Sequence, residues 1–163
     1  MAAGFLQPGA APSLLDRLID LDPESQREAP LSSWERARKF RAALRRDLTA
    51  LLNTRRAAED FDRRYEEATN SLLTFGILDF TSYNLKKAVE REQLRRSIEQ
   101  AIRQFEPRLE RVEVSIKQAD PQKPLLGLQI SAALRSEAGE PVVFEATVER
   151  DSRRSIAFPP EKS

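Results

Sequence analysis

Two stretches of the chain repeat apolar residues at steps of three and four, the spacing of one face of an amphipathic helix. The first begins after Ser32, and Glu35 three residues later completes a capping-box pattern. We therefore expect one helix from about residue 33 to residue 53 or 54, and a second over about 90–105 whose start could lie several residues earlier. Their core-facing stripes are Ala37, Phe40, Leu44, Leu48 and Leu51, and Leu94, Ile98, Ala101, Ile102 and Phe105.

Three later stretches alternate apolar and polar residues, as strands do when one face meets a core and the other meets water. The turn-forming sequences ADPQKP and SEAGEP separate them. The simplest arrangement is an α+β fold: an antiparallel three-stranded meander packed against two main amphipathic helices, with a short N-terminal helix. The first and third strands would be the edges. The core-facing residues would be Val112, Val114 and Ile116; Leu126, Leu128, Ile130, Ala132 and Leu134; and Val142, Phe144, Ala146 and Val148.

The remaining stretches divide the chain into four parts. We expect residues 1–12 to be disordered, 13–30 to be a short helix and a polar linker, 31–149 to be a single domain, and 150–163 to be a loose tail. A helix of two turns is marginal alone in water, so the short helix would dock either on its own domain or on a partner. Its apolar residues are Leu14, Leu15, Leu18 and Ile19.

Composition excludes several kinds of chemistry. The 163 residues include no His and no Cys, which removes the usual general base, thiol catalysis and the commonest metal ligands. Five scattered glycines form no phosphate-binding loop. No stretch approaches the roughly 20 apolar residues of a membrane span, and the N-terminus lacks a signal-peptide pattern. We expect a cytoplasmic protein without catalytic residues, metal, cofactor or direct membrane insertion.

The charges are balanced over the whole chain but not along it. Lys and Arg number 27 against 26 Asp and Glu, so the net charge of +1 gives no general reason to expect nucleic acid as a partner. Between Glu35 and Arg56, however, eight residues are basic and two acidic. Such a run is usually a solvated face, and contact with an acidic partner is the alternative. Trp34 and Phe40 fit a helix-start anchor and a core residue better than a base-stacking series.

Residues 71–80 read SLLTFGILDF, an apolar run broken by Gly76. A run this short fits a buried strand or an irregular packed loop, and periodicity cannot decide between them. The glycine predicts either a positive φ or a close approach of another backbone.

The second helix must end at Glu106-Pro107-Arg108. Pro107 lacks a donor N–H and disfavours the helical conformation at Glu106, so the chain should leave the helix extended. Residues two apart in an extended segment point to the same side, so Glu106 and Arg108 would project together. Val112, on the core face, has the same parity provided that no β-bulge intervenes, and Leu109 has the opposite parity, which warns of one. The motif is either a helix stop with two solvated charges or an aimed ion pair available to a partner.

Three segments together resemble a known family: SLLDRL at 13–18, NSLLTFGILDF at 70–80 and IEQAIRQFEPRL at 98–109. They are similar to the TssE family, the baseplate wedge subunits of bacterial type VI secretion, and the resemblance covers about residues 13–149. That family is related to a wedge protein of contractile phage tails and carries the label "lysozyme-like". The family usually has Asn-Tyr-Gly-Leu-Pro-Asp where this chain has Thr74, Phe75, Gly76, Ile77, Leu78 and Asp79.

The resemblance implies a structural role in a large hetero-oligomer at the inner face of the cell envelope. It implies that Glu106, Pro107 and Arg108 dock on a helical bundle of TssF and TssG, with TssK further out. It also implies that a sheet edge receives a strand from the sheath subunits TssB and TssC. Gly76 and Asp79 would be a loop contact. The N-terminal docking residues would be Leu14, Leu15, Asp16, Arg17 and Leu18.

Two other functions remain open at this point. One is an anti-adaptor that regulates stress-response proteolysis and shares the fold family; the other is a lysozyme-like hydrolase. SLLDRL and the intact Glu-Pro-Arg sequence favour the wedge protein, and the lack of His and of an evident acid pair argues against the hydrolase. If the motif meets a partner, Arg108→Ala should abolish wedge assembly while the isolated domain still folds.

Overall fold

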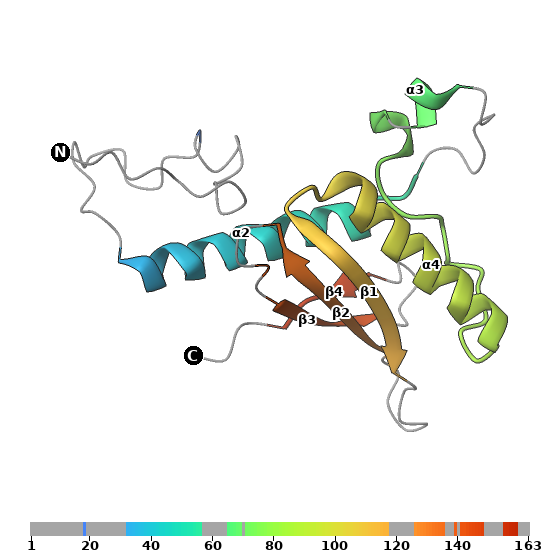
Figure 1. Ribbon diagram of the computed structural model, residues 1–163. Helices are drawn as coiled ribbons and strands as arrows, with labels where there is room; N and C mark the ends of the chain where they lie inside the picture. Colours follow the sequence, from blue (N-terminus) through green and yellow to red (C-terminus); the bar gives the residue numbers. More distant parts are fainter. Residues whose placement is uncertain are drawn as a thin grey trace.

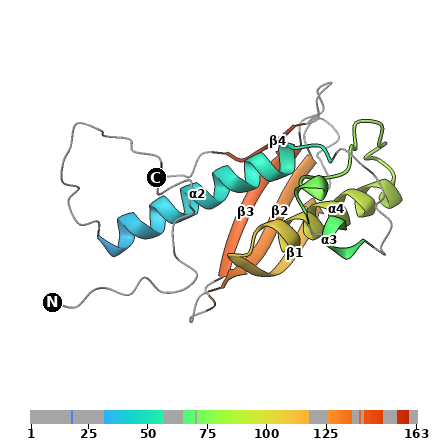
Figure 2. The ribbon, with the colours of Figure 1, turned by 90° about the horizontal axis from the view of Figure 1, so that it is seen from above.

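Two long helices pack against one face of an antiparallel sheet, so the α+β fold is confirmed (Figure 1). Figure 2 shows both helices on the same side of the strands. Apolar side chains of the helices and of one strand face form a single core. The computed structural model describes residues 18, 32–56, 65–69, 71–117, 126–135, 139, 141–148 and 155–159.

Helix α2 spans Ser33–Asn53, as predicted. Its start is fixed by the capping box, in which Glu35 N–H donates to Ser32 Oγ at 3.2 Å and Ser32 N–H donates to the Glu35 carboxylate at 2.8 Å. Ala37 is exposed, contrary to the predicted stripe, because the first turns of α2 extend past the sheet (Figures 1 and 2). The buried residues of α2 are Phe40, Leu44, Leu48, Leu51 and Leu52.

Helix α4 spans Ala88–Phe105 and buries the predicted stripe except for Phe105, which is half-buried. The Phe105 ring meets the edge of Phe75 at a centroid distance of 5.2 Å. Before α4 lie the one-turn helix α3, Glu66–Thr69, and the 3-10 helix η1, Leu72–Thr74. The apolar run at 71–80 is therefore an irregular packed loop and not a strand.

The first three strands form the predicted meander. They are β1 at Leu109–Lys117, β2 at Leu126–Leu134 and β3 at Pro141–Val148. All neighbours pair antiparallel in the order β1-β2-β3-β4. The predicted alternation holds, with Phe144 and Ile116 half-buried and the other predicted core positions buried.

A fourth strand corrects two expectations. Strand β4, Ile156–Ala157, pairs with Thr147 and Val148 of β3, so the sheet has four strands and residues 155–159 are not a loose tail. Ile156 is 1% exposed, and its backbone N–H and C=O bond the Asn53 side-chain amide, both at 2.9 Å. The buried side chain and the two bonds to α2 explain why this segment is held in the sheet.

The N-terminal expectations lie almost entirely outside the described residues. This applies to the short helix, the linker, and the docking residues Leu14, Leu15, Asp16 and Arg17. Leu18 is described: it is helical and 81% exposed. None of the helices in the described ranges is long and apolar enough to cross a membrane.

Candidate functional site

The chain turns sharply where α4 meets β1. Glu106 caps α4 by donating its N–H to Ile102 O at 2.9 Å, and its own carbonyl accepts the N–H of Leu109 at 3.1 Å. Residues 106–109 thus form a β-turn, and the extended geometry expected after Pro107 is wrong. Proline is favoured at the second position of such turns because its fixed φ suits them. Pro107 is exposed at the tip of the turn.

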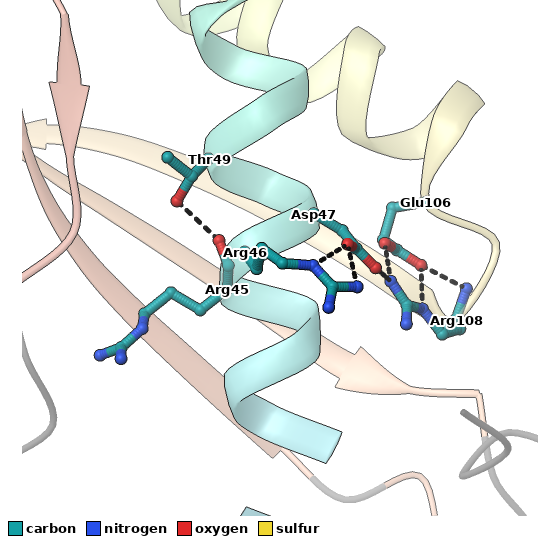
Figure 3. Close-up of polar contacts among 6 residues, drawn as sticks. All are labelled: Arg45, Arg46, Asp47, Thr49, Glu106 and Arg108. Carbon is teal, nitrogen blue, oxygen red and sulfur yellow. Dashed lines mark hydrogen bonds and ion pairs between the residues drawn. The ribbon is translucent and has the colours of Figure 1, made fainter. Parts of the chain in front are cut away.

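The turn brings Glu106 and Arg108 into direct contact (Figure 3). Arg108 donates from Nε to Glu106 Oε1 and from Nη2 to Glu106 Oε2, both at 2.6 Å. The Arg108 backbone N–H also donates to Oε1 at 3.2 Å. The two side chains do project together, but through the turn rather than through strand parity. Two parallel charge-assisted bonds give the pair a defined geometry.

A third residue, Asp47 of α2, completes the arrangement. Arg108 Nη2 donates to Asp47 Oδ2 at 2.7 Å, and Arg46 donates to Asp47 Oδ1 from Nε and Nη2 at 3.0 and 2.8 Å (Figure 3). We call Glu106, Arg108 and Asp47 the carboxylate clamp. It joins α2 to the start of β1. The sequence analysis did not identify Asp47, which is 61 residues from Arg108. The only sign of it in the sequence is that it is acidic among the basic residues of this helix.

The carboxylate clamp is mostly inside the protein. The side chain of Glu106 is 5% exposed, that of Arg108 15% and that of Asp47 24%. The hydrogen bonds that Arg108 donates to Glu106 and, to a smaller extent, to Asp47 raise the pKa of Arg108, although its burial acts to lower it. The three side chains are bonded to one another and mostly buried, so the clamp is part of the domain's own structure. Removing one partner of such a buried pair would leave an uncompensated charge.

One polar atom of the clamp has no hydrogen-bond partner in the part of the chain that the structure describes. Arg108 Nη1 is buried and makes no hydrogen bond among the described residues. The guanidinium carbon lies 5.8 Å from the centre of the Phe40 ring, which offers a weaker contact. An unmade bond to a buried charged donor is unfavourable, so this atom offsets part of the stability that the other bonds of the clamp contribute.

A β-bulge is present in β1, which settles the parity that Leu109 left open in the sequence. Glu110 pairs with Ala133 and Glu113 with Ser131, so β1 contains one residue more than β2 over this interval. Arg111 has φ of 52°, the left-handed conformation of a bulged residue. The bulge restores the parity of the strand, which is why Leu109 and Val112 are both buried.

Gly76 and Asp79 lie in the loop that packs on the end of α2. Gly76 has φ of +101°, and a Cβ there would be 2.4 Å from Thr54 O, so both reasons for glycine apply. Ile77 N–H donates to Thr54 O at 3.0 Å and Arg56 N–H donates to Ile77 O at 2.9 Å, which fastens the loop to the helix. Asp79 accepts the N–H of Thr81 at 2.9 Å and lies 3.8 Å from Arg55.

Two hollows lie along α4. The one beside the Gly76 loop, of about 250 Å³, has no carboxylate among its described lining residues. The other, of about 480 Å³, has Glu99, which is paired with Arg95 and Arg103. Neither offers the pair of carboxylates that glycoside hydrolysis requires. In the described ranges, no three acidic side chains are gathered as metal ligands.

Comparison with known proteins places the chain in a family. Residues 38–139, more than half of the chain, match the family described as baseplate wedge protein gp25. No curated protein matches. Among solved structures, a chain of "The baseplate complex from the type VI secretion system" is 17% identical with a TM-score of 0.48, over 69% of this chain and 96% of that one. A protein described as a tail lysozyme from Geobacter sulfurreducens is 13% identical with a TM-score of 0.47, over 83% and 100%. On the family match, this chain belongs to the gp25 family of baseplate wedge proteins.

Proposed function

We propose that this protein is a structural, non-catalytic component of a type VI secretion baseplate that links a TssK-TssF-TssG wedge to the contractile sheath on the cytoplasmic side of the envelope. Membership of the gp25 family is the observation that carries the proposal. The choice of secretion system over phage tail rests on the three segments that resemble the TssE family. The structure adds no site that a hydrolase would need among the described residues.

The surface around the carboxylate clamp is our candidate for docking on TssF and TssG. Glu106 is too deeply buried to be a primary contact, so its role would be to hold Arg108 in place. The accessible parts are Pro107 at the tip of the turn, the remaining exposed edge of Arg108, and Arg46, whose side chain is 43% exposed. Arg108 Nη1 is buried, so a partner would meet the exposed edge of Arg108 and not this nitrogen.

The sheet offers two edges for a strand from the sheath subunits TssB and TssC. Strand β1 pairs with β2 alone among the described strands, and β4 covers only the Thr147–Val148 end of β3. Unpaired backbone groups along an edge accept an added strand by main-chain hydrogen bonds. The sequence predicted the first and third strands as the two edges, but β4 covers one end of β3. We therefore favour β1 as the edge that receives the strand.

Affinity capture from a cell lysate, with the recovered proteins identified by mass spectrometry, tests the proposal. We expect TssF and TssG to be recovered with the wild-type chain. Recovery of an adaptor of a proteolysis machinery without TssF and TssG would support the regulator instead. Turnover of peptidoglycan by the purified chain, abolished by a single Glu substitution, would establish the hydrolase and end the structural proposal.

A further inference from the structure

The N-terminal end of α2 projects from the domain with all its faces accessible. From Ser33 to Lys39 every residue is exposed or half-exposed, and Phe40 is the first that is buried. The blue end of α2 extends beyond the sheet in both ribbon views (Figures 1 and 2). An exposed helix end normally frays, but the capping box at Ser32 and Glu35 fixes this one.

One face of this projecting end combines an aromatic side chain with two positive charges. Trp34, Arg38 and Arg41 follow each other at helical spacing and are all exposed. Trp34 is 67% exposed, and Arg38 stacks 5.0 Å from its ring centre. Trp34 is therefore not the helix-start anchor that the sequence suggested. Glu35, three residues before Arg38 on the helix, interacts electrostatically with Arg38. We call these three residues the cationic stripe.

Charge decides which kind of partner fits. From Ser33 to Arg46, α2 has six basic residues and one acidic residue, Glu35, whose carboxylate is engaged by Ser32. The surface is thus strongly positive on a chain whose net charge is only +1. A single aromatic residue gives no series of stacking platforms for nucleotide bases, which favours a protein partner over nucleic acid. Trp and Arg are also the residues that most often dominate binding at protein interfaces.

We propose that the cationic stripe binds an acidic segment of a neighbouring baseplate protein, with carboxylates on Arg38 and Arg41 and an apolar side chain over Trp34. The identity of the neighbour rests on the function proposed above, whereas the chemistry of the segment rests on the stripe itself. Further along the helix, Arg45 donates to Pro159 O at 2.9 Å, so the chain's own C-terminal segment limits the site at that end.

The first test uses Trp34 as a built-in reporter, because it is the only tryptophan in the chain. A Glu-rich peptide with one central Leu is titrated into the full chain, beside the same peptide with Ser for Leu and a single-stranded oligonucleotide of equal charge. We expect the Leu peptide to shift the emission to shorter wavelength and to bind best. Binding by the oligonucleotide alone would replace the protein partner with nucleic acid, and an unmoved emission with every probe would overturn the proposal.

Charge reversals locate the site. The double substitution Arg38→Glu with Arg41→Glu should weaken peptide binding by about tenfold or more, because two attractions become repulsions. The double substitution Arg36→Glu with Lys39→Glu makes the same charge change on the opposite side of the helix and should weaken binding by less than about threefold. All these positions are exposed, so the thermal midpoints should stay close to wild type. Equal losses from both changes would mean that binding follows overall charge and not the stripe.

The second test examines the assembled wedge. Because the chain has no Cys, Ala37→Cys beside the cationic stripe and Lys39→Cys on the other flank each give it a single thiol. Maleimide labelling at Ala37→Cys should slow in the purified wedge relative to the free chain, while labelling at Lys39→Cys should not. Unchanged labelling at Ala37→Cys would overturn the inference while the wedge stands. If no wedge forms, the proposed function fails and the peptide titration alone decides the inference.

Discussion

Arg108 donates to Glu106 and Asp47 at once, and both carboxylates are mostly withdrawn from water. Replacing it with Ala leaves two neighbouring acidic groups without their cation. We predict that Arg108→Ala lowers the free energy of unfolding of the isolated domain by about 3 kcal/mol, measured by chemical denaturation. This replaces the expectation from the sequence that the variant would fold normally and fail only in assembly.

Arg96→Ala is the matched control for this change. Arg96 has the same side chain, is 74% exposed and pairs with Glu92 on the surface of α4. Its loss should cost less than about 1 kcal/mol, as for other exposed ion pairs. If both variants unfold at the same denaturant concentration as wild type, the carboxylate clamp does not stabilise the domain.

Gly76 gives a second prediction at the level of one residue. Alanine there would require a φ of +101° and would bring its Cβ to 2.4 Å from Thr54 O. Gly76→Ala should therefore lower the free energy of unfolding by about 2 kcal/mol or more. At Gly127, by comparison, the nearest atom to an added Cβ is Lys117 Cβ at 3.4 Å, so Gly127→Ala should be nearly neutral. A nearly neutral Gly76→Ala would show that the loop relaxes away from α2.

Single residues also show what sequence reasoning could reach. The opposite parity of Leu109 warned of a bulge without deciding it, and Gly76 indicated a positive φ or a close backbone approach, because both signals are local. The contact of Arg108 with Asp47 spans 61 residues and depends on how α2 crosses the start of β1. No local pattern encodes that crossing, so the motif looked free when it is bonded within the chain.

Strand β4 is held by β3 and also by Asn53 of α2, which is 103 residues away from Ile156 in the chain. Ile156 is 1% exposed and packs in the core with α2 beside it. Ile156→Ala should lower the free energy of unfolding by about 2 kcal/mol or more, as truncations of buried side chains do. Val143→Ala on exposed β3 surface, where the side chain is 55% exposed, should have a much smaller effect. Equal losses of stability from Ile156→Ala and Val143→Ala would mean that residues 155–159 are a loose tail.

The long elements were predictable for a physical reason. Helices α2 and α4 and strands β1 to β3 each bury one face, so their periodicity is visible in the sequence. A strand of two residues is too short to show any period, and β4 was missed on that account. The turn at 106–109 was misjudged because proline restricts the residue before it toward extended structure and equally favours the second position of a turn.

The docking surface that we propose combines residues of α2 and of the turn at 106–109. Arg46→Ala removes an exposed guanidinium beside the carboxylate clamp, where its side chain is 43% exposed. We predict that it weakens binding to TssF and TssG by about tenfold at little cost in stability, measured by titration calorimetry. Arg96→Ala also removes a surface arginine, but from α4, and should leave the affinity for TssF and TssG unchanged. The same loss of affinity in both variants would place the docking surface elsewhere.

For the whole molecule, we propose that this gp25-family chain is a wedge subunit that binds TssF and TssG. The most direct measurement is the mass, by light scattering during size-exclusion chromatography, of the purified chain mixed with a purified TssF–TssG complex. We predict that the chain co-elutes with the TssF–TssG complex and that the mass of the complex increases by a whole number of chains. A folded chain that elutes alone, beside an intact TssF–TssG complex, would contradict it.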